Sequence, residues 1–208
     1  GRLLRSLPEP LLDKSLTRYH ILVNGAQVYD SFEDKTLLRE ELTPQQAMCM
    51  LHFLKSHNVL RGVYIDGLGH MSREDFSEIE AVAATPATAA LMRRSYQTDE
   101  DLDAVTAQHD SVQKIIAFFR NPDDKQATIR EITSRFPGYA VSSSLGNNIE
   151  INAKNATKGS ALCFLCEKIG VPIGQCMAFG DGTNDYSMLR AAGFGVAMGN
   201  ASEEVQSC

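Results

Sequence analysis

The sequence predicts an α/β protein with a parallel-sheet core and an inserted α+β domain, and three observations support this prediction. Near the C-terminal end, the apolar run Met177–Phe179 leads into Gly-Asp-Gly and then into a helical pattern. A second short apolar run, Ile21–Val23, ends in Asn-Gly-Ala. Between them, residues 43–153 show an order of elements that suits a mostly antiparallel sheet covered by helices on one face. We therefore expect a discontinuous core of residues 1–42 and 154–208.

The first elements are predicted from short apolar runs and one helix start. Ile21–Val23 is typical of a buried strand, and Gln27–Tyr29 continues beyond the Asn-Gly-Ala bend. Thr43-Pro44-Gln45-Gln46 has the residues of a capping box, with proline at the first helical position. Apolar residues then recur at helical spacing, so we expect this helix to end at about His57.

The inserted domain is predicted to continue with alternating strands and helices. Its helix that opens at Asn121-Pro122-Asp123-Asp124 ends at Pro137-Gly138, where proline and glycine stop it. Apolar and polar residues then alternate on both sides of Gly146-Asn147, which predicts a β-hairpin. The remaining predicted elements are strands at Val59–Ile65 and Val112–Phe119, a turn at Asp66–Gly69, and helices at Arg73–Val82 and Glu100–Thr106.

Composition excludes several classes of function. The 208 residues are 43% hydrophobic and 22% charged, which is ordinary for a folded domain. A net charge of −6 argues against a nucleic-acid partner, because such proteins normally carry a basic patch. No apolar run approaches the roughly 20 residues that span a bilayer, so we expect no membrane partner.

Five cysteines are spaced irregularly, and we interpret them as reduced thiols of a cytoplasmic protein rather than as a disulfide framework. Cys163 and Cys166 form a C-x-x-C pair inside a helical pattern, but no second pair or nearby histidines complete a zinc site. Small buried hydrophobes are therefore the favoured interpretation of this pair, over a zinc or redox role. The other cysteines are Cys49, Cys176 and Cys208.

The segment after Met177–Phe179 holds the most informative residues. Asp181 and Asp185 lie four residues apart, around Gly182 and Asn184. A strand that runs into such a loop places polar groups at the carboxyl edge of a sheet, where open α/β sheets bind ligands. Hard oxygen donors there suit Mg²⁺. An ordinary Asp/Gly/Asn turn is the alternative, but two acids, two glycines and an asparagine within six residues favour a site.

These motifs resemble those of phosphatases of the haloacid dehalogenase (HAD) superfamily, and most of all its Cof-type branch. Gly180–Asp185, with Met188-Leu189 and Gly195–Ala201 after it, resembles the fourth motif of the family. The other matches are Thr157–Leu162 to the third motif, with Lys158 as its lysine, Asn24-Gly25-Ala26 to the end of an early core strand, and Gly1-Arg2 to the tail of the second motif.

The resemblance implies a HAD-like, Rossmann-like core with a cap domain, and a Mg²⁺-dependent phosphatase. Such an enzyme would hydrolyse small phosphorylated metabolites through an aspartyl-phosphate intermediate. Asp181 would be a Mg²⁺ ligand, Asp185 would support the metal site, and Asn184 would orient phosphate or metal-bound water. Lys158 would supply a point charge for the transferring phosphate. A solvated lysine is the alternative for Lys158, although a cation is mildly unfavourable at a helix amino terminus.

Three further residues are candidates for substrate binding, each with a plain alternative. Asn24 would line a pocket, or else it belongs to an ordinary turn. Arg2 would meet substrate phosphate or the cap, or else it is solvated. Asn200 would face the pocket, or else it is a helix N-cap.

One departure from the family separates the remaining hypotheses. The family's Asp-x-Asp nucleophile motif precedes its second motif, and neither Asp66-Gly67 nor Asp181-Gly182 has the Asp-x-Asp-Gly spacing. We expect an excerpt of a longer protein, monomeric or homodimeric, that hydrolyses no phosphomonoester by itself. The alternatives are a related capped sugar-phosphate phosphatase or phosphomutase, and a non-catalytic metabolite-binding module on a degenerate HAD fold.

Overall fold

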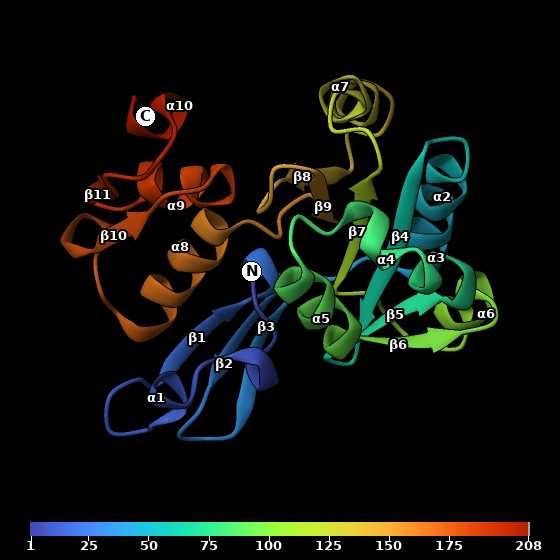
Figure 1. The fold of residues 1–208 in the computed structure, drawn as a ribbon. Helices are drawn as coiled ribbons and strands as arrows, with labels where there is room; N and C mark the ends of the chain where they lie inside the picture. The colour runs from blue at the N-terminus through green and yellow to red at the C-terminus, as the bar shows by residue number, and fades with distance from the viewer. Residues whose placement is uncertain (208) are drawn as a thin grey trace. The chain divides into compact units, whose positions relative to one another are not determined.

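The computed structural model describes residues 1–207, and its internal contacts divide the chain into two compact units (Figure 1). The first unit comprises residues 1–40, 142–144 and 153 onward, and the second comprises 41–141 and 145–152. The predicted insertion starts and ends within two residues of the second unit, whereas 142–144 group with the first.

The N-terminal part of the first unit forms an antiparallel three-stranded sheet. After η1 (Leu4–Ser6) and α1 (Glu9–Leu12), the strands β1 (Tyr19–Leu22), β2 (Gln27–Asp30) and β3 (Lys35–Arg39) pair in chain order. The prediction of parallel core strands in residues 1–42 is therefore wrong. Only four residues separate each strand from the next, and a parallel crossover needs a dozen or more.

The C-terminal part of the first unit has the predicted parallel arrangement. It contains α8 (Lys158–Ile169), η3 (Ile173–Gln175), β10 (Met177–Gly180), η4 (Thr183–Asp185), α9 (Tyr186–Ala191), β11 (Phe194–Ala197) and α10 (Glu203–Gln206). Strands β10 and β11 pair in parallel, and the segment that contains α9 connects them. The polar loop 181–185 therefore begins where β10 ends.

A tight turn in the N-terminal part of the first unit packs against the C-terminal part. In η2 (Val23–Gly25), between β1 and β2, Asn24 and Gly25 have φ values of 61° and 100°. A Cβ atom on Gly25 would lie 2.1 Å from the carbonyl oxygen of Thr157. Thr157 is the N-cap of α8, so this glycine allows the turn to pack against the start of that helix.

The second unit is a six-stranded sheet with helices, in the strand order β6-β5-β4-β7-β9-β8 (Figure 1). The pairs β4–β5, β4–β7 and β7–β9 are antiparallel, and the pair β5–β6 is parallel. Its elements are α2 (Pro44–Leu54), β4 (Val59–Ile65), β5 (Leu68–Ser72), α3 (Arg73–Ser77), α4 (Ile79–Val82), α5 (Pro86–Ser95), β6 (Tyr96–Asp99), α6 (Leu102–Ala107), β7 (Lys114–Phe119), α7 (Asp124–Arg135), β8 (Tyr139–Ser142) and β9 (Asn148–Ala153).

Several local predictions are confirmed in this unit and two are wrong. The capping box of Thr43 and Gln46 and the strand Val59–Ile65 are as expected. The predicted turn at Asp66–Gly69 is shorter than expected: it consists of Asp66 and Gly67, because Leu68 already belongs to β5. Every residue of β7 is buried, and successive side chains of a strand point to opposite faces, so both faces of the sheet are covered rather than one.

We predict that Gly25→Ala destabilises the protein by about 2–4 kcal/mol, because it adds a left-handed backbone penalty to a steric clash. Urea unfolding followed by far-ultraviolet circular dichroism measures this loss. Gly174→Ala is the matched control, since a Cβ atom there meets no atom within 4 Å and its φ is not positive. Equal stability of the two variants would show that the contact between the turn and α8 is loose.

Candidate active site

The Asp185 carboxylate organises the loop that follows β10. Its Oδ2 atom accepts hydrogen bonds from the backbone N–H groups of Asp181 and Gly182, each at 3.1 Å. A Cβ atom on Gly180 would lie 2.4 Å from Cβ of Asp185, so the strand must end in glycine for the loop to fold back. Hydrogen bonds between the Asp185 side chain and the loop's own backbone therefore fix the conformation of residues 181–185.

Lys158 completes this arrangement from a different element. Its Nζ atom donates to Oδ1 of Asp185 at 2.5 Å. The lysine lies in the first turn of α8, where Thr157 caps the helix by accepting from Ser160 N–H. Both Asp185 oxygens therefore have partners, one the lysine and the other the loop backbone.

Close packing of α8 against α9 sets the position of the lysine. The N–H of Gly159 donates to Oγ of Ser187 at 3.0 Å. A Cβ atom on Gly159 would lie 2.3 Å from the carbonyl oxygen of Ser187, so a larger residue would push the helices apart. The sequence does not reveal Ser187 as part of the site, because nothing about a single serine 28 residues from Gly159 indicates this contact.

Two opposing effects act on the pKa of the Asp185 carboxyl. Burial raises this pKa, since the side chain is only 9% exposed. The hydrogen bond and charge of Lys158, together with the backbone N–H groups of Gly182 and Asp181, outweigh burial and hold the pKa below its usual value. Asp185 is thus kept ionised beside the lysine.

Asp181 is the exposed carboxylate of the loop. Its Oδ2 atom accepts from Nδ2 of Asn200 at 2.8 Å, and no cation pairs with it among residues 1–207. Asn184 makes no side-chain hydrogen bond within the same residues, and its Oδ1 would lie 2.8 Å from a Cβ atom on Gly182. The loop therefore presents one carboxylate and one amide oxygen that are not committed to a charged partner.

These donors fit Mg²⁺. No group of three or more His, Cys, Asp or Glu side chains that could hold a metal occurs among residues 1–207. Mg²⁺ does not need such a cage, because it keeps several waters and is bound through one or two carboxylates and substrate phosphates. Of the predicted metal residues, Asp181 and Asn184 have oxygens without a charged partner, whereas both oxygens of Asp185 are already engaged.

The remaining predicted residues lie near the site to different degrees. Asn24 is buried in the turn that packs on the start of α8. The backbone carbonyl of Arg2 accepts a hydrogen bond at 3.0 Å from the N–H of Val23, the first residue of that turn. The Arg2 guanidinium, in contrast, donates to the Ser6 carbonyl at 3.3 Å, within its own segment. The structure thus brings Asn24, and not the Arg2 side chain, to the start of α8.

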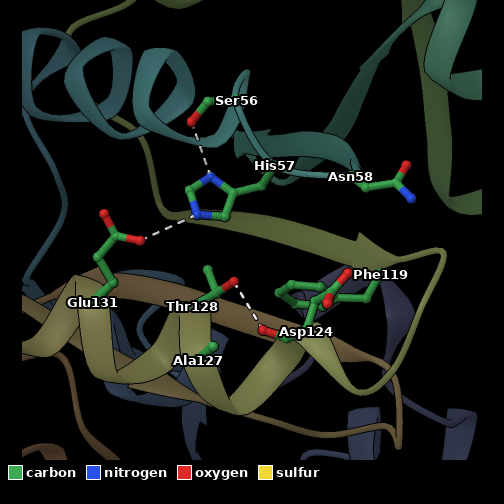
Figure 2. Close-up of a pocket in the computed structure, with 8 residues that line it drawn as sticks. All are labelled: Ser56, His57, Asn58, Phe119, Asp124, Ala127, Thr128 and Glu131. Atoms are coloured by element: carbon green, nitrogen blue, oxygen red, sulfur yellow. Dashed lines mark hydrogen bonds and ion pairs between the residues drawn. The ribbon is translucent and has the colours of Figure 1, made fainter.

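The second unit contains a separate pocket of about 270 Å³ between the end of α2 and α7 (Figure 2). In it, the His57 ring lies between Ser56 and Glu131, with Nε2 3.5 Å from a glutamate oxygen. The pocket contains none of the predicted site residues. Its lining consists of Ser56, His57, Asn58, Phe119, Asp124, Ala127, Thr128 and Glu131.

Comparison with known proteins places the chain in a family. The profile of haloacid dehalogenase-like hydrolases matches residues 1–208, and the chain belongs to this family. A Bacillus subtilis haloacid dehalogenase-like hydrolase has the same fold, with a TM-score of 0.82 and 24% identity over 100% of this chain and 78% of that one. The expected HAD-like α/β fold is therefore confirmed.

Curated relatives carry phosphatase names. The HMP-PP phosphatase of Klebsiella pneumoniae is 28% identical over 100% of this chain and 72% of its own length. The phosphoglycolate phosphatase of Pyrobaculum neutrophilum is 36% identical over 68% of this chain and 54% of its own. Matches to three further curated phosphatases span only 29%, 23% and 34% of their lengths.

We predict that Lys158→Met raises the pKa of Asp185 above its usual value, because burial remains and the neighbouring cation is lost. In the native protein the lowered pKa gives stability that is present above about pH 4 and is lost as pH falls through the folded pKa. In the variant the sign reverses, and stability falls as pH rises through the raised pKa.

Carbon-13 NMR titration of the Asp185 carboxyl, with urea unfolding at several pH values, measures both effects. Lys154→Met is the matched control, because this exposed lysine is near in sequence and Asp185 should titrate in that variant as in the native protein. An Asp185 titration in Lys158→Met that matches the native one would disprove the ion pair.

Proposed function

We propose that this chain carries the metal- and phosphate-binding part of a Mg²⁺-dependent phosphatase that acts on small phosphorylated metabolites. The observation that most supports the proposal is the pairing of Lys158 with Asp185 beside the exposed Asp181. A cation and a carboxylate without a charged partner thus lie at the end of a parallel strand, where open α/β sheets bind ligands. The phosphatase names of the relatives agree with this chemistry.

Phosphoryl transfer depends on positioning and charge more than on covalent chemistry by the protein. Lys158 is fixed by Asp185 and by the packing of α8 on α9, so its ammonium is already in place when a phosphate enters. Its partner Asp185 stays ionised, and the hydrogen bond to it keeps the lysine side chain oriented. We propose that Lys158 neutralises the oxygens of the transferring phosphoryl group.

Asp181, with Asn184 beside it, would hold Mg²⁺, and the metal would neutralise phosphate charge when bound. Asn200 orients the Asp181 carboxylate through its hydrogen bond, as outer partners of metal ligands commonly do. Asp185 supports the site through the loop backbone and Lys158 rather than by touching the metal. Asn24 and Arg2 remain proposed contacts for substrate.

In the complete reaction we propose that the phosphoryl group passes to an aspartate nucleophile and then to water. That nucleophile would come from an Asp-x-Asp-Gly motif, which residues 1–208 do not contain. The second unit would act as the cap that excludes water from the first step. We propose a cytoplasmic location; no helix within residues 1–207 has both the length and the apolar character to span a bilayer.

The competing proposal is a binding module that senses a phosphorylated metabolite without hydrolysing it. A site that no longer binds metal would be expected to lose the exposed Asp181 carboxylate and the Lys158–Asp185 ion pair, and both are present. Assay of the full-length protein against sugar phosphates, nucleotides and phosphorylated cofactors separates the two. Mg²⁺-dependent release of phosphate supports the phosphatase, and ligand binding without release supports the module.

We predict that Asp181→Asn in the full-length protein lowers Mg²⁺-dependent turnover by about 100-fold or more, because a direct ligand should matter at least as much as its outer partners. Asp185→Asn should lower turnover by about 10–100-fold, since it loosens the loop and the lysine. Steady-state kinetics over a range of Mg²⁺ concentrations measures both.

Glu204→Gln is the control for these variants, because this exposed acid lies outside the loop and should leave turnover unchanged. Circular dichroism verifies that each variant is folded. Native turnover of Asp181→Asn at low Mg²⁺ would remove Asp181 from the metal site.

We also predict that Lys158→Met lowers turnover by about 10²–10³-fold, as expected for removal of a preorganised charge at the reacting group. Lys154→Met should retain native turnover. Single-turnover kinetics separates a loss in the chemical step from a loss in substrate binding. A variant that changes only substrate affinity would reassign Lys158 from transition-state stabilisation to substrate binding.

A further inference from the structure

Two cysteines of the first unit lie against each other. The Sγ atoms of Cys166 and Cys176 are 3.2 Å apart, one on α8 and the other immediately before β10. The C-x-x-C pair that the sequence indicates is a different one. Its first member, Cys163, is exposed, so the expectation of two buried cysteines holds only for Cys166.

We propose that Cys166 and Cys176 are a redox modification site that closes an intramolecular disulfide. The two sulfur atoms need to approach from 3.2 Å to the bond length of about 2.05 Å. Val171, Pro172, Gly174 and Gln175, which lie between α8 and Cys176, are all exposed, so few side-chain contacts oppose a small shift of Cys176 toward Cys166.

The two sulfurs have different access to an oxidant such as a small-molecule disulfide. Cys176 is partly exposed, whereas Cys166 is buried. Burial, followed by the neighbouring Cys176 sulfur, raises the pKa of the Cys166 thiol to about 11. Cys176 therefore supplies the first attacking thiolate and Cys166 resolves the product.

With glutathione disulfide as oxidant, the reaction balances in two exchanges. The Cys176 thiolate attacks one glutathione sulfur, a mixed disulfide forms, and the other glutathione leaves as a thiolate that takes up a proton. Cys166 then loses its proton and attacks the Cys176 sulfur, which releases the second glutathione. Two protein thiols are oxidised, and one glutathione disulfide is reduced to two thiols.

The new bond would join the two elements that carry the candidate active site. Cys166 lies eight residues after Lys158 on α8, which is about 12 Å along a helix. Cys176 precedes β10, whereas Asp181 follows it. The disulfide would therefore tie α8 to β10 at the end opposite the loop, without covering Asp181 or Lys158. We expect it to raise the melting temperature while the site stays open.

The test uses the full chain with Cys49, Cys163 and Cys208 replaced by serine, so that only the proposed pair remains. Incubation with glutathione disulfide should remove both thiols, lower the mass by about 2 Da, and be reversed by dithiothreitol. Trypsin should then yield residues 159–168 linked to residues 169–190, since Lys168 separates the two cysteines. The oxidised form should melt at a higher temperature than the reduced form.

The matched control also carries Cys166→Ser, so that Cys176 remains alone. It should stop at the mixed disulfide with glutathione, and a second control with Cys176→Ser instead should react far more slowly. If circular dichroism shows that either control is unfolded, peptide mapping of the oxidised wild-type chain identifies which cysteines are linked. A Cys163–Cys166 link there, or two intact thiols after Cys49 and Cys163 have reacted, would overturn the proposal.

Discussion

The candidate active site depends on a single carboxylate, that of Asp185. One of its oxygens binds two successive backbone N–H groups of the loop after β10, and the other binds the ammonium of Lys158 from α8. A buried carboxylate is costly unless it is paired and hydrogen-bonded, and here both conditions are met. The same pairing shapes the loop and orients the lysine.

Several glycines make this arrangement possible. Gly180 lets the Asp185 side chain lie over the end of the strand, and Gly159 lets α8 approach α9. Gly25 plays a similar part in the turn that packs on the start of α8. At each position a Cβ atom would fall within 2.5 Å of another atom, so close backbone approach, rather than loop flexibility, explains these residues. Lys158 and Asp185 can form their ion pair because the backbone segments that carry them approach each other closely at these glycines.

Local patterns in the sequence predicted those parts of the fold that local interactions determine. The capping box at Thr43, the strand Val59–Ile65 and the strand-to-helix turn after Met177–Phe179 all depend on neighbouring residues. Strand direction in residues 1–42 depends on the length of the connections. The sequence predicts no strand at β3, because Lys-Thr-Leu-Leu-Arg shows no alternation of apolar and polar residues. The sequence does not predict β5 or β6, because Leu-Gly-His-Met-Ser and Tyr-Gln-Thr-Asp contain no run of alternating apolar and polar residues long enough to indicate a strand.

For the candidate site, the sequence motifs indicated the residues, and the family resemblance implied different roles for Asp181 and Asp185. The contacts behind that difference come from the fold, in which Asp181 is exposed and Asp185 is buried in an ion pair. The contact of Ser187 with Gly159 and the approach of Cys166 to Cys176 join segments that only the fold brings together. No spacing rule for either pair exists in the linear sequence.

The most direct test of the central claim is a crystal structure of the full-length protein with Mg²⁺ and fluoroberyllate, a mimic of a phosphorylated aspartate. We expect Mg²⁺ at about 2.0–2.1 Å from an Asp181 oxygen. We also expect Lys158 to contact the fluoroberyllate while it keeps its bond to Asp185. A metal bound directly by Asp185, or a Lys158 ammonium turned away from the anion, would contradict it.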